Sequence, residues 1–186
     1  HSKSTISIRT NLTRCTPDEL RVMLEAEGVT VTAVDELNYA FVISGFDYLN
    51  GLQSFRDGLF YVQDISSMLV AQTAAPKKGD YVIDVCAAPG GKSTHIAELL
   101  QGSGHVLARD LTDNKVDMIE ENIERHGLNN MSAEVWDATV FDADSAGKAD
   151  ILICDLPCSG LGVLGRKKDI RYKMTPESVD ELAALQ

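Results

Sequence analysis

Two short stretches of the sequence carry side chains suited to chemistry. The first is a Pro-Gly-Gly turn that runs directly into Lys92. The second places Cys158 three residues after Asp155 and next to a proline. A cysteine in this setting suggests covalent catalysis on a pyrimidine, because methylation at C5 requires a soft nucleophile to add at C6 before the C5 proton leaves. Methylation of an amino group needs no thiol, so Cys158 favours a reaction at C5.

The Pro-Gly-Gly turn lies between a predicted strand and a predicted helix. Residues 81–85 are rich in strand formers, the glycines let backbone approach a ligand closely, and a helix beginning near Lys92 offers its N-terminus to an anion. A Walker A loop would need glycine at position 86, where the chain has Cys86, and the dinucleotide fingerprint G-x-G-x-x-G is absent. The turn therefore fits a ligand with a carboxylate at the helix N-terminus, such as S-adenosylmethionine.

Three acids stand at the ends of apolar runs that predict parallel strands, namely residues 105–110, 132–136 and 151–154. Asp110 lies 20 positions after Gly90, the spacing typical of a carboxylate that binds ribose hydroxyls. Asp137 is placed to accept from an adenine amino group, and Asp155 ends the last run. We expect these acids to gather at the carboxyl edge of an open α/β sheet, where such folds bind ligands.

Residues 58–171 resemble a known family through the motifs GLFYVQDISSMLV, DVCAAPGGKSTHIAEL and DLPCSGLGVLGRKKDIRYK. The resemblance is to the Nol/Nop/Sun-type RNA 5-methylcytosine methyltransferases and, among them, to the bacterial small-subunit ribosomal RNA methyltransferase B (RsmB) group. It implies methylation of cytosine C5 in ribosomal RNA, with S-adenosyl-L-methionine as the cofactor.

The resemblance also implies roles for individual residues. Lys92 and Asp155 would face the target cytosine, and Cys158 would assist product release rather than attack the ring. The nucleophile in the family is a second cysteine in a later Thr-Cys-Ser-like strand end, which this sequence does not contain. The cofactor would be bound by the residues that match Cys86, Ala87, Ala88, Pro89, Gly90, Gly91, Lys92, Asp110, Asp137 and Asp155.

We therefore expect an α/β fold with a Rossmann-like S-adenosylmethionine-dependent methyltransferase sheet that is incomplete at its C-terminal side. The sequence ends at Gln186, in a helix predicted to start near Thr175. A chain of this kind keeps the cofactor motifs but is expected to lack turnover. A sheet edge left without its neighbours would favour self-association.

The predicted domains are a small α+β, RRM-like module at residues 1–55 and the methyltransferase domain at residues 56–186. In the first module, Thr16 forms a capping box, Leu20, Met23 and Leu24 predict a buried helix face, and Gly28 ends the helix. Strands are expected near residues 5–9, 29–34 and 39–44. Residues 62–74 are expected to form a helix that packs on the second sheet.

Composition is consistent with a cytoplasmic enzyme. At 186 residues and 44% hydrophobic content, the chain can bury a core. There is no apolar run of membrane length, and the four cysteines show no zinc-binding or disulfide spacing. We therefore expect no membrane and no metal. Cys154 lies inside an apolar run and is expected to be a buried hydrophobic residue.

A net charge of −11 argues at first against an RNA partner. The basic residues are not evenly distributed, however, and five of them follow the Pro-Cys motif closely. These candidate RNA-binding residues are Arg166, Lys167, Lys168, Arg171 and Lys173. The expected partner is small-subunit ribosomal RNA.

Two other functions remain open. One is another nucleotide-dependent α/β enzyme such as a dehydrogenase, which the missing glycine fingerprint disfavours. The other is a noncatalytic RNA-binding or assembly module. Cofactor choice separates the methyltransferase from the dehydrogenase, whereas RNA binding that persists without cofactor would favour the noncatalytic module.

Overall fold

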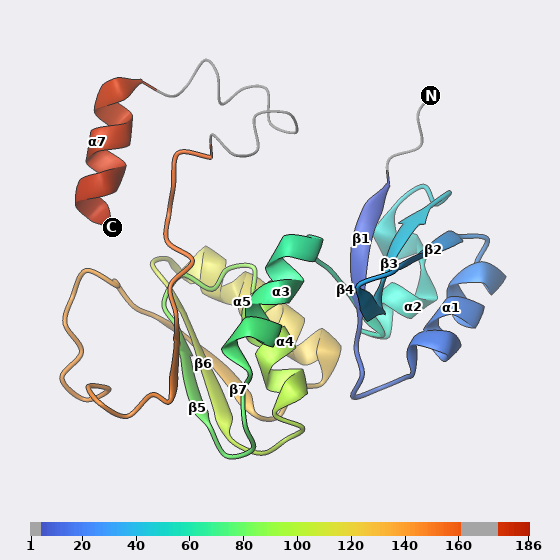
Figure 1. The fold of residues 1–186 in the computed structure, drawn as a ribbon, viewed down its shortest axis with the longest axis horizontal. Coiled ribbons are helices and arrows are strands. Elements are labelled where there is room, and N and C mark those ends of the chain that lie inside the picture. The colour runs from blue at the N-terminus through green and yellow to red at the C-terminus, as the bar shows by residue number, and fades with distance from the viewer. Residues whose placement is uncertain (1–4, 161–174) are drawn as a thin grey trace.

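The computed structural model describes residues 5–160 and 175–186. It contains two four-stranded sheets, which Figure 1 shows at opposite ends of the molecule with helices between them. Their strand orders are β2-β3-β1-β4 and β7-β6-β5-β8.

The first sheet is antiparallel and comes from the N-terminal part of the chain. Its core includes Ile8, Leu24, Phe41 and Phe60, each 5% exposed or less. The elements of this part are β1 (Ile6–Thr10), α1 (Pro17–Ala26), β2 (Thr30–Val34), β3 (Leu37–Ser44), η1 (Leu49–Gly51), α2 (Gln53–Arg56) and β4 (Phe60–Val62).

Helix α1 begins as the sequence predicts. Thr16 Oγ1 accepts from the Glu19 backbone N–H, and the Glu19 carboxylate accepts from the Thr16 backbone N–H, which completes the capping box. Leu20 and Leu24 are fully buried, but Met23 is 43% exposed, so its predicted place on the buried face is wrong. Met23 lies about 100° around the helix from Leu24 and points out of the narrow stripe that contacts the sheet.

The second sheet is parallel, as expected, with β5 and β6 at its centre. Its core includes Val82, Ile96, Val106 and Ile119, all fully buried. The elements are α3 (Ile65–Ala74), β5 (Tyr81–Asp84), α4 (Gly91–Leu99), β6 (His105–Asp110), α5 (Asp113–His126), β7 (Met131–Val135), β8 (Ile151–Ile153) and α7 (Pro176–Leu185).

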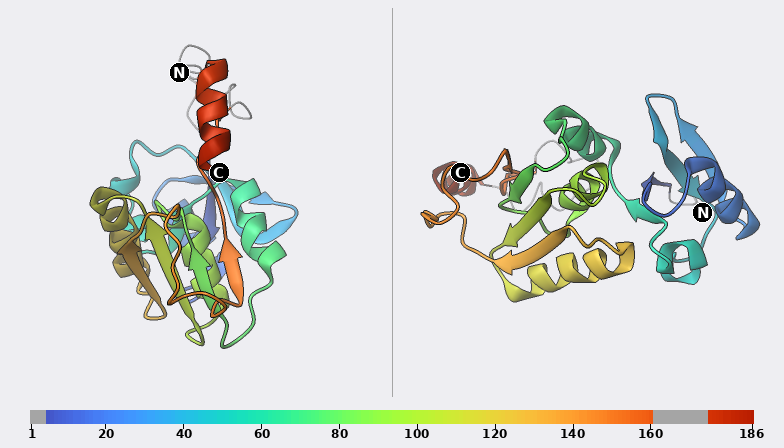
Figure 2. Two further views of the ribbon diagram at one scale, coloured as in Figure 1. Left: turned by 90° about the vertical axis from the view of Figure 1, so that its left-hand side faces the viewer. Right: turned by 90° about the horizontal axis from the view of Figure 1, so that it is seen from below.

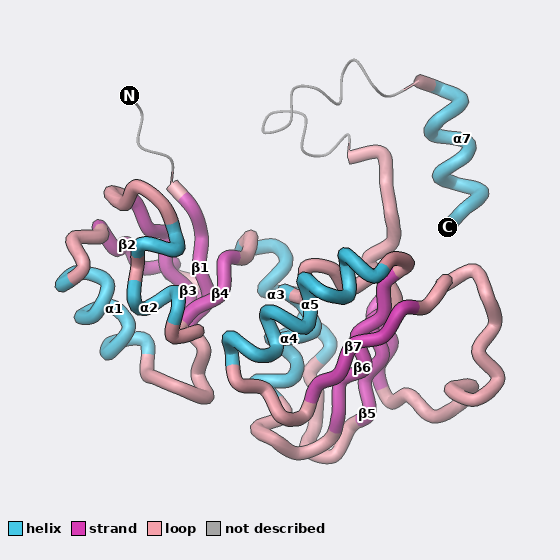
Figure 3. The backbone as a smooth tube through the Cα atoms, turned by 180° about the vertical axis from the view of Figure 1, so that it is seen from behind, coloured by secondary structure: helices cyan, strands magenta, loops and turns pink. Residues whose placement is uncertain are grey.

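Three helices separate the two sheets. Figure 3 shows α3, α4 and α5 between the strands of the first sheet and those of the second. Helix α7 begins with a Thr175 capping box near the predicted position. In Figure 1 and in the left view of Figure 2 most of the helix projects away from both sheets, but its C-terminal end borders the carboxyl edge of the second sheet, where Gln186 Nε2 donates to the Pro157 carbonyl at 2.6 Å.

Strand β4 lies beyond the predicted domain boundary at residue 55 but belongs to the first sheet. The sequence predicts a helix from residue 62, but Val62 is wrongly placed there because it pairs with Ile8 in the first sheet, and α3 begins only at Ile65. The first sheet thus continues past residue 55 and ends at Val62. We propose that the two structural units divide between β4 and α3.

Strand β8 is an edge strand among the residues that the structure describes. It pairs with β5 on one side, and its Leu152 is 58% exposed. Cys154, directly after the strand, is exposed as well, so its predicted burial is wrong. The apolar run predicts a parallel strand, as observed, and described neighbours cover only one edge of β8.

Candidate functional site

The loop that connects β5 to α4 lies at the carboxyl edge of the parallel sheet. Gly90 adopts φ 101°, a left-handed conformation that glycine reaches without strain, and it is the N-cap of α4. The Ala87 N–H donates to the Arg109 carbonyl at 2.9 Å, and the Gly90 N–H donates to the Ala87 carbonyl at 2.6 Å. These bonds hold the predicted cofactor loop against β6 and turn the N-terminus of α4 toward the sheet edge.

Asp110 joins this loop to the end of β6. Its carboxylate accepts from the Ala88 N–H at 3.0 Å, from the Leu111 N–H at 2.8 Å and from Lys115 Nζ at 2.8 Å. Burial alone would raise the pKa of Asp110, but the Lys115 ammonium and the two backbone N–H groups together hold it below its ordinary value. Asp110 is therefore an anion at neutral pH, at the predicted position.

A cavity of about 330 Å³ opens beside Asp110. The residues that line it include Cys86, Trp136, Asp137 and Leu152. Asp137 Oδ1 accepts from the Thr139 N–H at 2.9 Å and from Thr139 Oγ1 at 2.7 Å, which lowers the pKa of this exposed carboxyl. An apolar cavity with carboxylates at its rim can hold a heteroaromatic ring joined to a sugar.

A second cavity, of about 280 Å³, lies on the other side of the loop. Lys92 and Asp155 line it and form an ion pair, with Lys92 Nζ 2.5 Å from Asp155 Oδ2. The sequence-predicted pair is thus brought together from the start of α4 and from the segment after β8. The Asp155 side chain is 58% exposed, so the pair can meet a ligand that enters from solvent.

Asp84 contributes a buried carboxyl to the same cavity. It is 1% exposed and accepts from Ser93 Oγ at 2.6 Å. Burial raises its pKa to about 6, against the lowering effect of the Ser93 hydroxyl and of the Cys86 N–H. This side chain can therefore change its protonation state near neutral pH, or bind a cation as a carboxylate.

Residues of the first sheet also reach the loop, and sequence reasoning missed them. The Tyr61 hydroxyl donates to the Pro89 carbonyl at 2.9 Å, and Arg9 Nη1 donates to the Gly91 carbonyl at 2.9 Å. Arg9 is fully buried, and its Nη2 pairs with Glu98 on α4 at 2.9 Å. The sequence signal for Tyr61 and Gln63 is the motif GLFYVQDISSMLV, which contains both, whereas no local pattern marks Arg9.

The structure gives fewer contacts for the remaining predicted residues. Cys158 is exposed and follows Asp155 by three residues, as required by the sequence. For Cys86, burial and the nearby Asp110 and Asp84 carboxylates raise the pKa of the thiol. The predicted RNA-binding residues, Arg166, Lys167, Lys168, Arg171 and Lys173, lie outside the residues that the structure describes.

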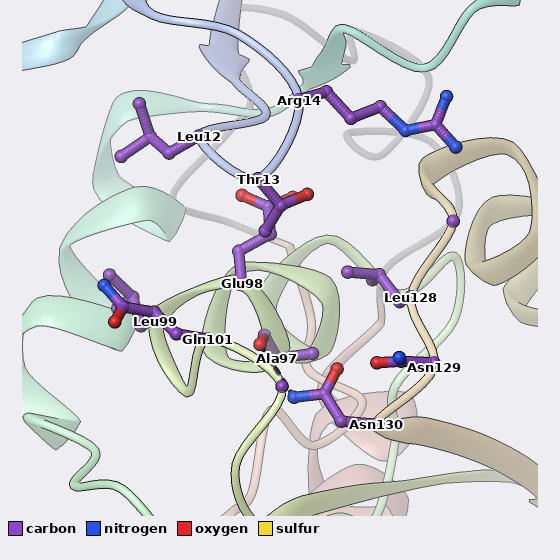
Figure 4. Close-up of a pocket in the computed structure, with 12 residues that line it drawn as sticks. Leu12, Thr13, Arg14, Ala97, Glu98, Leu99, Gln101, Leu128, Asn129 and Asn130 are labelled. Atoms are coloured by element: carbon purple, nitrogen blue, oxygen red, sulfur yellow. Dashed lines mark hydrogen bonds between the residues drawn. The ribbon is translucent and has the colours of Figure 1, made fainter.

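Another cavity, of about 550 Å³, lies near the opposite end of α4. Figure 4 shows it between the loop that carries Leu12, Thr13 and Arg14, the end of α4, and the loop that carries Asn129 and Asn130. The end of α4 and the loop before β7 lie at the amino ends of the parallel strands. The cavity is therefore separate from the cofactor loop, which lies at the carboxyl ends.

Metal and membrane features are also missing from the described part of the chain. Residues 5–160 and 175–186 contain no cluster of three or more histidine, cysteine or acidic side chains arranged to hold a metal ion. Within the same ranges, no helix has the length and apolar character needed to cross a membrane.

Comparisons with known proteins match the chain to a methyltransferase family. Residues 71–186 match the family described as 16S rRNA methyltransferase RsmB/F. A probable ribosomal RNA small subunit methyltransferase B from Bacillus subtilis is 38% identical over 182 residues, covering 97% of this chain and 40% of that protein. A tRNA (cytosine(72)-C(5))-methyltransferase from Pyrococcus horikoshii is 44% identical over 115 residues, covering 62% of this chain and 29% of that protein.

A solved structure gives the same picture at the level of the fold. The crystal structure of PH0851 matches with a TM-score of 0.92 and 28% sequence identity, over 97% of this chain and 41% of that chain. Nearly all of this chain is matched in both proteins, and it spans about two fifths of the length of each.

Proposed function

Because the chain belongs to the 16S rRNA methyltransferase RsmB/F family, we propose that it forms the cofactor-binding part of an RNA cytosine-C5 methyltransferase. The substrate would be a cytosine in small-subunit ribosomal RNA, and the compartment the cytoplasm. The fold class agrees with this membership, since the parallel sheet is the Rossmann-like sheet expected for such enzymes.

The position of Asp110 is the observation that supports the proposal most strongly. Its carboxylate ends β6, bonds to the loop that precedes α4 and lines the apolar cavity beside Trp136. A ribose bound there could donate its hydroxyls to Asp110 while its base enters the cavity. Another part of the same ligand would then reach the N-terminus of α4. The residues present therefore fit S-adenosylmethionine, which supplies an electrophilic methyl group.

Cofactor binding is assigned to the loop and to the acids of the sheet edge. The residues are those predicted from the sequence: Cys86, Ala87, Ala88, Pro89, Gly90, Gly91, Lys92, Asp110, Asp137 and Asp155. Among these, the Asp137 carboxylate lines the apolar cavity and would meet the amino group of the base.

The target cytosine is assigned to the open side of the Lys92–Asp155 pair. The Lys92 ammonium is fixed by the Asp155 carboxylate and can donate to the carbonyl oxygen or to a ring nitrogen of a cytosine that approaches it. Cys158 follows on the same segment, and its thiol would assist release of the methylated base. The attacking thiolate would come from a second cysteine outside this sequence, so the chain alone would bind cofactor without turnover.

A transfer assay tests these assignments. The chain is incubated with methyl-labelled S-adenosylmethionine and small-subunit ribosomal RNA, in parallel with a form extended through the later Thr-Cys-Ser-like segment of the family. We expect label in 5-methylcytosine from the extended form alone. Transfer by the chain itself would overturn the nucleophile assignment, and RNA binding without any transfer by the extended form would favour a noncatalytic module.

A further inference from the structure

Gln63 is a buried side chain with an unused donor next to the cofactor loop. It is 6% exposed, and it lines the 280 Å³ cavity together with Asp84 and Lys92. Within the described part of the chain, its Nε2 has no hydrogen-bond partner. Burying an amide N–H without a partner is costly, so a donor kept in this state indicates a ligand that accepts from it.

Arg9 fixes which way the Gln63 amide faces. Arg9 Nη1 donates to Gln63 Oε1, and because a guanidinium has donors only, the amide cannot turn over without losing this bond. Arg9 is itself held by Glu98 and by the Gly91 carbonyl. The backbone of Gln63 is fixed too, since its N–H donates to the Ser7 carbonyl at 3.1 Å.

The orientation places Gln63 Nε2 beside the first turn of α4. A Cβ built on Gly91 would lie 3.6 Å from Nε2, so the amide nearly touches the first residue of the helix. Helix α4 has nine residues and no side chain caps its N-terminus, and the first N–H groups of a helix have no partner within it. Two kinds of donor, one side-chain amide and the helix N-terminus, thus border the same cavity.

The other walls of the cavity define the chemistry of the ligand. Asp84 and Asp155 carry carboxyl groups there, which would repel a phosphate but would attract an ammonium group. A ligand with a carboxylate and an ammonium on one carbon satisfies both sets of groups. The amino-acid end of S-adenosylmethionine is such a ligand.

We propose that the Gln63 side-chain amide donates a hydrogen bond to the carboxylate of the amino-acid end of the cofactor, with Arg9 as the residue that orients it. The first sheet would thereby complete a cofactor site built on the second. This inference rests on the proposed function, because it assumes that the ligand is S-adenosylmethionine.

Calorimetric titration with two ligands tests the inference. S-adenosylmethionine is compared with decarboxylated S-adenosylmethionine, which lacks only the carboxylate. Gln63→Glu keeps the size of the side chain and its contact with Arg9 but replaces the donor by an acceptor. Gln72→Glu, on an exposed position of α3, makes the same change in charge away from the cavity and serves as the control.

We expect Gln63→Glu to weaken S-adenosylmethionine binding by about tenfold or more, the usual cost of losing a hydrogen bond to a charged group. Binding of the decarboxylated ligand should change by less than about twofold, and Gln72→Glu should leave both affinities unchanged. Gln63→Leu removes the donor without adding a charge, and it should likewise lose the preference for S-adenosylmethionine over the decarboxylated ligand. This variant replaces Gln63→Glu if Gln63→Glu does not fold.

Three results would overturn the inference in distinguishable ways. Unchanged S-adenosylmethionine affinity in the Gln63 variants would remove Gln63 from the site and leave the proposed function intact. An equal loss for both ligands would assign Gln63 a structural role only. A folded wild-type chain that binds neither ligand would contradict the proposed function and, with it, this inference.

Discussion

Asp84 differs from the other carboxylates of the site because nothing offsets its burial fully. Asp110 is also buried, but Lys115 and backbone N–H groups compensate for the loss of water and lower its pKa. Asp84 has one strong donor, Ser93 Oγ, and burial raises its pKa to about 6. The two side chains end neighbouring strands, yet the folded protein stabilises the charge of one and penalises the charge of the other.

The Asp84 pKa predicts a specific dependence of stability on pH. The folded-state pKa of about 6 lies above the ordinary value of 3.8, so the folded state holds the Asp84 proton more tightly than the unfolded state does. The contribution of this proton to the free energy of unfolding is complete below pH 3.8 and is lost as pH rises through 6. The shift corresponds to roughly 3 kcal/mol. Asp84→Asn removes the titration, so the variant should gain stability relative to wild type by about that amount between pH 4 and pH 7.

Urea unfolding of both proteins at a series of pH values measures this difference. Asp117→Asn, which removes one carboxylate at an exposed position of α5, serves as the control. A stability difference between wild type and Asp84→Asn that stays constant from pH 4 to pH 7 would contradict the assignment.

Single residues can be predicted from the sequence where local motifs determine them. Asp110, Lys92 and Asp155 lie where strand ends and the Pro-Gly-Gly turn indicate. Gln63 cannot be assigned a role in this way, because its burial and orientation depend on Arg9, 54 positions earlier in the chain. The expected burial of Cys154 is wrong because burial after β8 depends on which strands cover that edge.

At the scale of elements, the turn before β4 lies at the contact between the two units and accepts only glycine at position 58 without a clash. Gly58 precedes β4 and has φ 65°, and a Cβ at this position would lie 1.9 Å from the Arg125 carbonyl oxygen on α5. Its own carbonyl accepts from Asn11 Nδ2 at 2.9 Å. The backbone there touches both units, so a side chain would force the last turn of α5 away from the first sheet.

Comparing Gly58→Ala with Gly28→Ala separates the cost of the clash at this contact from the cost of backbone strain alone. Gly28, at the end of α1, has φ 82° and nothing within 4 Å of the position that a Cβ would take, so Gly28→Ala should cost only about 1 kcal/mol. Gly58→Ala should cost at least about 2 kcal/mol more, because it adds a clash with backbone that cannot rotate away. Denaturant unfolding of the two variants gives the comparison, and equal losses would contradict the account.

The elements themselves are largely predictable, since their signals are local. The Thr16 capping box, Gly28, Gly127 and the apolar runs of the parallel strands identify α1, α5, β6 and β8 from the sequence. Strand β4 escapes prediction because three residues carry little pattern of their own. Its conformation follows from pairing with β1, some fifty positions away in the chain.

At the scale of the whole molecule, two sheets share one cofactor loop. Arg9 and Tyr61 donate from the first sheet to the Gly91 and Pro89 carbonyls, while Asp110 accepts from the Ala88 N–H of the same loop at the end of β6. The first unit therefore contacts the loop directly and is not an independent attachment. Neither half of the sequence alone could indicate this, because the contacts cross between the two units.

The edge strand β8 predicts self-association. Leu152 is exposed on it, no strand among the described residues pairs with its outer side, and an edge of this kind can pair with another copy. We expect light scattering to give an apparent mass that rises with concentration and falls back in a Leu152→Lys variant. A monomeric mass at high concentration in the wild-type chain would contradict this expectation.

The central claim concerns the ligand at the carboxyl edge of the second sheet, and calorimetry tests it most directly. S-adenosylmethionine is titrated into the folded chain, with NADH as the competing class of ligand and Asp110→Ala as the site variant. The account predicts saturable binding of S-adenosylmethionine, no binding of NADH, and a loss of binding in the variant. NADH binding, or S-adenosylmethionine binding that is unchanged in Asp110→Ala, would contradict it.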